Sequence, residues 1–455
     1  MVASTWAYDA YGALESSTTK VSGATVFQET IVRDALARPI SKAEVVQGVT
    51  VNWAYGYDAA NRLQQVTKDG AMVGAYLFDA NGNRTSASGV AATFDSQDRL
   101  LAVGPVRYSY DAFGSLLEKR DTSTAPGRVT QYQHDGNGGL RKATLPDGTV
   151  LDYLVDARAR RVGKKRNGVL ERGWLYDGQL RIVAELDGSG SVTSRFVYGV
   201  LSHSPDYLER NGVAFRFVHD SLGSVRLVVN ATTGSIAQRI DYDAWGVVLA
   251  DSAPGFQPFG FAGGLYDADM GLVRFGARDY DAAAARWTAN DAIRFGGGDT
   301  NLYAYAGGDP VNRIDTDGRV WKLVTRVAGA GIRAIRQISR QQAIDAYRRG
   351  QDVATDRAKD ARKLAKDASK AEGGGGAACH PEQHGNGARH LHGLDEAGRH
   401  VGRGHVFIEA FKDALIFFAD PNDNGEMFDS DDIYELTNPL PVDTRSTPVD
   451  PYEMI

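Results

Sequence analysis

Over the first 250 residues, aromatic and β-branched residues alternate with polar ones in short stretches separated by turns of Asp, Asn and Gly. A period of two residues predicts β-strands with one buried face. Asp and Asn at a turn bind the backbone and tolerate left-handed φ, which Gly adopts freely. Each stretch, such as residues 55–67, therefore predicts a β-hairpin, and helical periodicity is scarce before residue 318.

An aspartate recurs at the turn of each predicted hairpin. The steps between successive aspartates are 21, 16, 16, 24, 21 and 21 residues, along the series Asp58, Asp79, Asp95, Asp111, Asp135, Asp156 and Asp177. A repeat of about twenty residues is typical of an array of units that bury their faces against one another. We therefore expect a mainly β fold, in which residues 1–318 form one continuous curved antiparallel sheet of hairpins. The alternative is an ordinary β-sandwich with chance similarity between its strands.

Composition narrows the class of protein. The length of 455 residues exceeds a single ordinary core, and the net charge of -6 indicates no particular partner. The single cysteine, Cys379, excludes an intramolecular disulfide framework. We expect no transmembrane segment, since no apolar run reaches the ~18 residues that a membrane helix needs. Residues 1–11 lack the features of a signal peptide, so we expect a protein that is cytoplasmic in the producing cell and secreted without one.

From residue 239 onward the chain contains longer motifs in a fixed order. They are residues 241–246 (DYDAWG), 258–267 (PFGFAGGLYD), 271–281 (GLVRFGARDYD), 286–291 (RWTAND) and 301–312 (NLYAYAGGDPVN). In these motifs and in its repeats the chain resembles the YD-repeat proteins of the Rhs (rearrangement hot spot) family. The resemblance covers residues 1–318 and divides them into a β-shell fragment, residues 1–238, and an Rhs-associated core, residues 239–318.

The resemblance implies both a fold and a function. Rhs proteins resemble a spiral β-sheet wound into a hollow shell, which encloses a variable C-terminal toxin used in competition between bacteria. The core closes the shell as a plug and acts as an intramolecular aspartyl protease that frees the toxin. Complete shells contain many more repeats, so we expect this chain to be a distal piece of one. The implied partners are a cognate immunity protein and a secretion-system component, and no cofactor is expected for the shell.

Three residues of the core match the protease of the family. There, an Arg-Asp pair and a second Asp twelve residues later are linked to cleavage, and Arg278, Asp279 and Asp291 have that spacing. Two carboxylates in one low-dielectric site do not both ionise readily, so one can remain an acid while the other activates water. The alternative is that both aspartates are ordinary turn residues.

The release motif of the family is Pro-x4-Asp-Pro-x-Gly followed by a large apolar residue, and it appears in altered form at residues 310–319. Thr316 replaces the second proline and Arg319 replaces the apolar residue. Ala292 replaces the proline that usually follows the second aspartate of the protease. The motif predicts cleavage between Arg319 and Val320, and these departures bear on the efficiency of cleavage rather than on the fold.

The composition changes after residue 318. Residues 320–372 contain 13 basic and 6 acidic residues with apolar residues three to four apart, which predicts a basic helical linker over residues 319–376. A small α+β domain is expected at residues 377–455, where residues 406–455 contain 2 basic and 12 acidic residues. Either the two parts pair with each other, or the basic part contacts nucleic acid or a membrane surface.

Six of the nine histidines lie in residues 380–405. The surrounding sequence predicts a hairpin with a three-residue loop at residues 396–398, in which Leu394 lies opposite His400. In that register three histidines share one face of the hairpin. His405 joins them only if a nearby glycine forms a β-bulge.

Histidines on one face suit two chemistries. One is a divalent metal site for Zn or Mg, with the candidate ligands His390, His392, His400, His405 and Asp395, and Glu409 as a further ligand. The other is metal-free acid and base catalysis of phosphodiester cleavage by His390, His392 and His400. The remaining alternative is a solvated histidine-rich hairpin without a catalytic role.

Two functions follow from these patterns. The preferred hypothesis is the C-terminal part of an Rhs polymorphic toxin, which cleaves itself near Arg319 and releases an effector that acts as a nuclease on nucleic acid. The alternative is a non-enzymatic YD-repeat scaffold or adhesion protein whose tail is a binding module. Two features distinguish these functions, the set of Arg278, Asp279 and Asp291 and the abrupt change of composition after residue 318. A pure scaffold needs neither of them.

Overall fold

The computed structural model describes residues 2–9, 13–297 and 299–319, and beyond them only the backbone of six strands. The chain divides into two compact units, residues 1–337 and 338–455. Among the described residues there is no helix that is both long enough and apolar enough to cross a membrane.

The first unit is dominated by one sheet of 24 strands, in which each strand pairs antiparallel with the next along the chain. This confirms the mainly β fold. The strands are β1 Val2–Tyr8, β2 Leu14–Val21, β3 Ala24–Arg33, β4 Pro39–Val46, β5 Val49–Tyr57, β6 Leu63–Lys68, β7 Ala71–Phe78, β8 Arg84–Ala87, β9 Val90–Phe94, β10 Leu100–Val103, β11 Val106–Tyr110, β12 Leu116–Asp121, β13 Arg128–His134, β14 Leu140–Thr144, β15 Val150–Val155, β16 Arg161–Arg166, β17 Val169–Asp177, β18 Arg181–Asp187, β19 Val192–Val197, β20 Tyr207–Arg210, β21 Val213–His219, β22 Val225–Asn230, β23 Ile236–Tyr242 and β24 Val248–Asp251.

The recurring aspartate builds the same turn in many hairpins. In one of them, Oδ1 of Asp58 accepts hydrogen bonds of 2.9 Å from the amides of Ala60 and Arg62, and Oδ2 lies 2.7 Å from the Arg62 guanidinium. Bonds from the second and fourth following amides recur at Asp34, Asp79, Asp95, Asp111, Asp135, Asp156, Asp187, Asp220 and Asp243. A carboxylate satisfies the turn amides that the sheet leaves unpaired.

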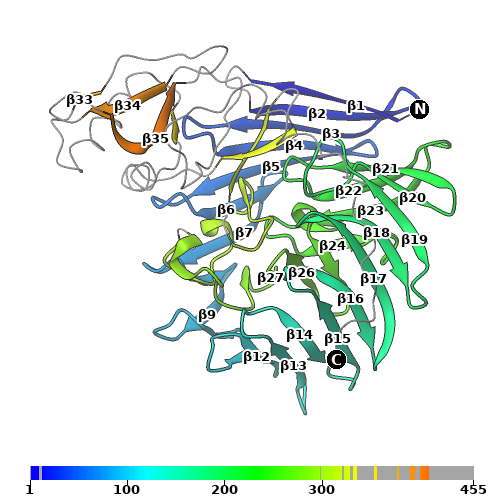
Figure 1. Ribbon diagram of the computed structural model, residues 1–455, viewed down its shortest axis with the longest axis vertical. Helices are drawn as coiled ribbons and strands as arrows, with labels where there is room; N and C mark the ends of the chain where they lie inside the picture. The colour runs from blue at the N-terminus through cyan, green and yellow to red at the C-terminus, as the bar shows by residue number, and fades with distance from the viewer. Residues whose placement is uncertain are drawn as a thin grey trace, which may run out of the picture. The chain divides into compact units, whose positions relative to one another are not determined.

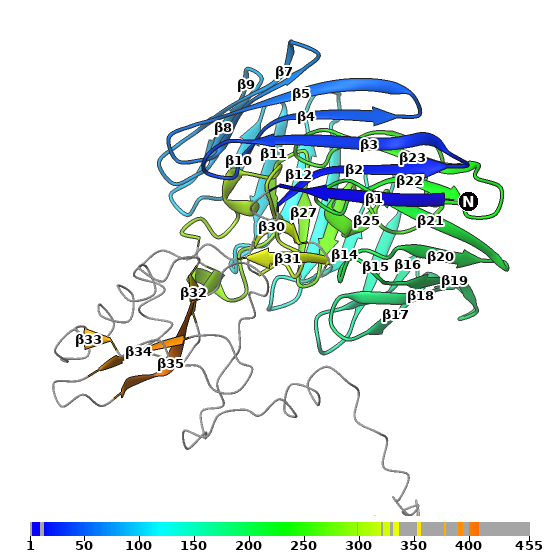
Figure 2. The same ribbon diagram turned by 90° about the horizontal axis from the view of Figure 1, so that it is seen from above.

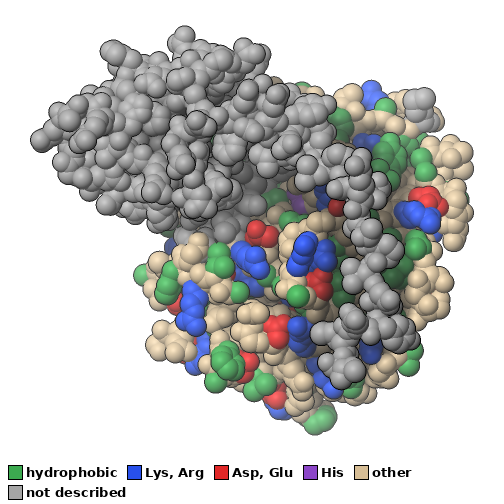
Figure 3. Space-filling model, viewed as in Figure 1, with side chains coloured by type: hydrophobic (Ala, Val, Ile, Leu, Met, Phe, Trp, Pro, Cys, Tyr) green, Lys and Arg blue, Asp and Glu red, His purple; other side chains and the backbone are tan. Residues whose placement is uncertain are grey.

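The arginine of such a turn also binds the next repeat. Arg62 donates to the carbonyl of Asp79 at 2.7 Å, and its guanidinium lies 4.7 Å from the ring centroid of Phe78. Arg160 does the same with the carbonyl of Gly178 and the ring of Tyr176, at 2.6 Å and 5.1 Å. In both of these repeats the aromatic residue before the aspartate therefore lies beside a cation of the preceding turn, and the neighbouring repeats stabilise one another. Figure 3 shows basic and acidic side chains interspersed over one face of the molecule.

The concave side of the sheet packs on an inner segment, residues 252–319, as Figures 1 and 2 show. Four hydrophobic clusters contain residues of both parts; in one of them Leu151 and Tyr153 of the sheet pack with Leu272. The inner segment consists of η1 Phe261–Gly263, β25 Leu265–Asp267, β26 Leu272–Phe275, β27 Arg278–Asp281, β28 Arg286–Trp287, η2 Arg294–Gly297, η3 Ala306–Gly308 and β29 Arg313–Ile314.

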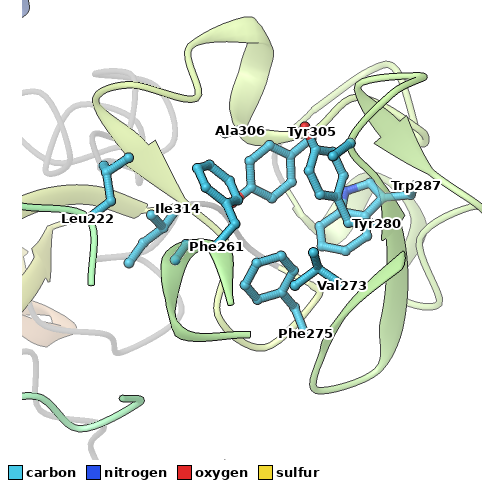
Figure 4. Packing of buried hydrophobic residues seen from close by; sticks show 11 residues of the cluster. Leu222, Phe261, Val273, Phe275, Tyr280, Trp287, Tyr305, Ala306 and Ile314 are labelled. Carbon is cyan, nitrogen blue, oxygen red and sulfur yellow. The ribbon is translucent and has the colours of Figure 1, made fainter. Parts of the chain in front are cut away.

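The inner segment has an aromatic core of its own, shown in Figure 4. The rings of Tyr280 and Tyr305 stack with centroids 4.1 Å apart, and Trp287 meets Tyr305 edge-on at 5.4 Å. Strands β25 to β28 form a separate four-stranded sheet. The expectation of one continuous sheet through residue 318 is therefore wrong after β24. The sequence between β24 and β25 is rich in Pro and Gly, and Pro cannot donate to a sheet ladder.

The basic helix expected after residue 319 is wrong wherever the structure describes this part. The observed elements are β30 Lys322–Val327, β31 Gly331–Ile335 and β32 Val353–Thr355. β30 pairs with β29 on one side and with β31 on the other. β30 contains Val324, Thr325 and Val327, and β31 contains Ile332 and Ile335. Such β-branched residues favour a sheet once a strand is available to pair with. The remainder of the predicted linker lies outside the described residues.

The second unit contains the predicted histidine hairpin. The strands are β33 Ala377–Ala378, β34 His390–Leu394 and β35 His400–Ile408, and Leu394 lies opposite His400 as predicted. The register shifts between Leu391 and Gly393, where β35 contains the extra residues of a bulge. The side chains of the four candidate histidines, Asp395 and Glu409 lie outside the described residues, so their convergence on a metal or phosphate stays a prediction.

Candidate functional site

One arginine at the start of β27 joins the elements that sequence reasoning connects with cleavage. Nη2 of Arg278 lies 2.9 Å from Oδ2 of Asp291 and 3.2 Å from Oδ2 of Asp315. Its Nε donates to the carbonyl of Gly318 at 2.6 Å, and its guanidinium lies 4.2 Å from the ring centroid of Trp287. With an exposed side-chain fraction of 3 %, Arg278 holds two carboxyl groups and the end of the release motif together inside the protein.

Two glycines let the release segment, which is residues 310–319 with the release motif, lie directly on the turn before β27. The amide of Ala277 donates to the carbonyl of Asp317 at 3.0 Å. A Cβ on Gly276 would come closer than 3.0 Å to the backbone of Asp317, and a Cβ on Gly318 equally close to the carbonyl of Phe275. Both glycines also have positive φ, at 44° and 66°. The glycine of the release motif is therefore required by a backbone-to-backbone contact.

Asp315 binds the residue that precedes the predicted scissile bond. Its Oδ1 accepts a hydrogen bond of 3.0 Å from the amide of Arg319, which Oδ1 of Asp317 also approaches at 3.0 Å. Burial raises the pKa of Asp315 to about 7; Asp317 adds to this rise, and Arg278 opposes it. Asp315 therefore binds its proton far more tightly than an exposed aspartate.

Asp291 is the second carboxyl group on Arg278. Burial raises its pKa, Arg278 opposes that rise, and Asp317 contributes to it by repulsion. Its Oδ1 accepts a hydrogen bond of 2.9 Å from the amide of Ile293, which fixes the carboxyl group in the turn that follows. Two acidic groups with raised pKa values thus face one arginine, an arrangement in which one of them can hold a proton while the other is ionised.

Asp279 is not part of this group. Its Oδ1 lies 2.9 Å from Arg161 of β16, and its Oδ2 lies 2.7 Å from Arg274 of β26. Burial by itself raises the pKa of Asp279, but the two arginines outweigh burial and lower it. Neighbouring residues of a strand point to opposite faces, so Asp279 turns toward the sheet while Arg278 turns toward the release segment. The structure therefore gives Asp279 and Asp291 different arginines instead of one shared site.

Sequence reasoning missed several residues of this site. Asp315 and Asp317 belong to the release motif, but their position in a presumed substrate hid their contacts with Arg278 and Arg319. The spacing of 118 residues between Arg161 and Asp279 carries no signal in a single sequence. The buried pair of Arg161 and Asp279 forms only in the folded chain, where the sheet curves around the inner segment.

Two cavities are lined by Arg319, at the end of the release segment. One of about 10 Å³ is lined by Arg278, Asp291, Asp315 and Arg319 among others, which is room for about one water molecule. The other, of about 640 Å³, lies beside Arg319 and is lined by hairpin turns of the sheet, such as residues 155–159, and by Ile293. Among the described residues, no group of three or more His, Cys, Asp and Glu side chains is arranged to hold a metal ion.

Comparison with known proteins gives matches to YD-shell proteins. The Teneurin YD-shell family matches residues 1–311. Teneurin-3 of Danio rerio is 28% identical over 344 residues, which are 70% of this chain and 12% of that protein. The tRNA3(Ser)-specific nuclease WapA of Bacillus spizizenii is 28% identical over 286 residues, which are 59% of this chain and 12% of that protein. The chain thus spans about an eighth of the length of these relatives.

Solved structures match this chain at a lower sequence identity. The crystal structure of TcdB2-TccC3-Cdc42 superposes with a TM-score of 0.42 and 16% identity, over 70% of this chain and 20% of that chain. A TM-score of this size adds nothing to the assignment made from the sequence.

Proposed function

The chain belongs to the Teneurin YD-shell family, and on that premise we propose that it is the C-terminal part of an Rhs-type toxin. In this proposal the protein cuts its own chain between Arg319 and Val320 and so releases residues 320–455. The observation that carries this proposal is the triple contact of Arg278 with Asp291, Asp315 and the carbonyl of Gly318.

The contacts of Arg278 support the choice of scissile bond. Arg278 binds the carbonyl of Gly318, and the peptide bond directly after the one that contains this carbonyl is Arg319–Val320, where the motif predicts cleavage. Asp291 binds the same guanidinium, and a carboxyl group whose pKa is raised by burial can serve as an acid or a base. Asp279 contributes differently: it joins the inner segment to β16 through Arg161 and so keeps β27 in place.

The released tail is proposed to be the effector. The similarity to a protein named as a tRNA nuclease favours a nuclease, with His390, His392 and His400 as its acid and base groups or as ligands of a divalent metal. Its partners would be nucleic acid, a cognate immunity protein and a component of a secretion system. Such an effector would be secreted from the producing cell.

The second candidate function is a YD-repeat scaffold or adhesion protein with a binding module as its tail. The observation that favours it is the full pairing of Asp279 with two arginines, because a structural ion pair needs no catalytic purpose. In that case the contacts of Arg278 would only stabilise the end of the inner segment against β27.

Mass spectrometry of the purified full-length chain separates the two functions. A protease yields a tail of 136 residues (455 − 319) that begins at Val320, and Asp291→Asn stays intact. Asp187→Asn is the matched control, because Asp187 forms the same kind of turn in an exposed hairpin and should leave cleavage unchanged. A wild-type chain that stays intact from acidic to alkaline buffer would rule out the protease and leave the scaffold.

A further inference from the structure

One lysine of the sheet reaches two carboxyl groups of the inner segment in a buried site. Nζ of Lys164, on β16, lies 2.8 Å from Oδ1 of Asp267 and 2.5 Å from Oδ2 of Asp269. The side chains of Lys164 and Asp267 are only 9% and 6% exposed. The hydroxyl of Tyr153, on β15, donates to Oδ2 of Asp267 at 2.8 Å. An amine, two carboxyl groups and a hydroxyl donor therefore meet at one point.

We propose that the side chains of Lys164 and Asp267 are joined by an amide bond, which forms after the chain has folded. Lys164 is the nucleophile, Asp267 is the group that it attacks, and Asp269 carries protons between them. The bond ties the sheet to the inner segment across 103 residues of sequence. It does not depend on the proposed self-cleavage, because both residues lie before the predicted scissile bond.

Two other lysines of the sheet bind carboxyl groups at hydrogen-bond distance, and neither has this arrangement. Lys119 binds Asp281 at 2.8 Å, but the lysine side chain is 28% exposed, and Asp281 is the one carboxyl group paired with it among the described residues. Lys42 binds Glu44 of its own strand at 3.0 Å, two residues away. Only at Lys164 does a second carboxyl group touch the amine while a hydroxyl group binds the far oxygen of the first.

The buried contact favours the reaction in two ways. Groups held together in one molecule react as if each were present at an effective concentration of up to about 10⁵–10⁸ M. Proton transfer from an ammonium group to a carboxylate also leaves two neutral groups, and such a transfer is easier in a low-dielectric site than in water. The neutral amine that results is the nucleophilic form of lysine.

The reaction releases one water molecule and needs no other reagent. Asp269 takes a proton from the ammonium group of Lys164 and passes it to Oδ1 of Asp267. Nζ then bonds to Cγ of Asp267, while the hydroxyl of Tyr153 stabilises the negative charge that develops on Oδ2. Asp269 carries a second proton from Nζ to the hydroxyl group at Oδ1, and the C–O bond breaks to release water. One hydrogen remains on the amide nitrogen, and Asp269 and Tyr153 end as they began.

The test is the mass of the full-length chain carrying Asp291→Asn, which keeps the chain in one piece if the proposed self-cleavage takes place. The crosslinked chain should weigh one water molecule less than its sequence. Trypsin does not cut after a lysine whose amine is blocked, so a digest should contain residues 162–165 joined to residues 240–274. A chain with the full mass of its sequence would overturn the proposal, and so would a loss of water without the joined peptides.

Three variants in the same background test the roles of the side chains. Lys164→Arg can keep the ion pair but cannot form the bond, so its mass should equal that of its sequence. The matched control is Lys119→Arg, which should still lose one water. Asp269→Asn keeps both partners of the bond and should slow its formation by about 10²–10⁴-fold, so that freshly purified protein is largely unlinked. A loss of water that persists in Lys164→Arg would overturn the proposal, and complete linkage in Asp269→Asn would overturn the role of Asp269.

Discussion

Removing the carboxylate of Asp279 should destabilise the first unit even in a chain that cannot cleave itself. The change Asp279→Ala leaves the guanidinium groups of Arg161 and Arg274 inside the protein without their shared anion. Asp279 is fully buried, and each arginine side chain is only 2 % exposed, so water cannot replace the lost partner.

The magnitude follows from that burial. Breaking a buried ion pair by removing one partner costs about 3–5 kcal/mol. The entropy of unfolding, about 2.1 cal/mol/K per residue over the 337 residues of the unit, amounts to roughly 0.7 kcal/mol/K. The expected loss of melting temperature is therefore about 4–7 °C.

The assay is thermal unfolding of the full-length chain, with Asp291→Asn present in every variant so that all chains remain intact. The control is Glu209→Ala, which breaks a pair of 3.1 Å with Arg195 whose side chains are 41% and 63% exposed. An exposed pair contributes at most about 1 kcal/mol, so the control should shift the transition by no more than about 1 °C. A shift for Asp279→Ala no larger than that of the control would refute the reasoning.

Three further predictions concern the release segment and the tail. Gly318→Ala should lower both the melting temperature and the cleavage rate, because the added Cβ would clash with the carbonyl of Phe275. Melting curves and mass spectrometry measure these two quantities. An unchanged cleavage rate would contradict the close contact. Since the folded chain keeps a proton on Asp315 up to a pKa of about 7 while the unfolded chain loses it near 3.8, stability should fall as pH rises between these values. Melting curves recorded at several pH values in the Asp291→Asn background check this. Adding Asp315→Asn should weaken the dependence of the melting temperature on pH. Expression of residues 320–455 in bacteria should be toxic. His392→Ala should abolish this toxicity while barely changing the melting temperature of the fragment. If the double variant His390→Ala/His392→Ala is fully toxic, the histidine hairpin has no catalytic role.

The position of Asp279 changes how a loss of cleavage should be interpreted. A variant of Asp279 that does not cleave is expected from either a catalytic or a structural role, since β27 also presents Arg278 to the release segment. A catalytic loss leaves the melting temperature near that of the wild type, whereas a structural loss lowers it by the amount worked out above. Measuring cleavage and melting on the same variant distinguishes the two roles.

The repeat architecture was predictable because its determinants are local. Asp58 binds amides two and four residues away, and Arg62 reaches the next turn, so the twenty-residue spacing by itself specifies hairpins joined in series. The register of Leu394 opposite His400 was predictable for the same reason, since a short loop sets the pairing of its flanks.

Contacts between distant parts of the chain were decided by the tertiary structure alone. The partner of Asp279 is Arg161, which lies 118 residues away, and only the curvature of the sheet around the inner segment brings the two together. The strand β30 is likewise decided by a contact outside the strand, because it pairs with β29 although its residues have helical spacing in the sequence. Hairpin turns and strand pairing across a short loop are local, so the sequence by itself determined them. Which carboxyl group meets which arginine is set by packing across the fold, where side chains from opposite faces of β27 enter different environments.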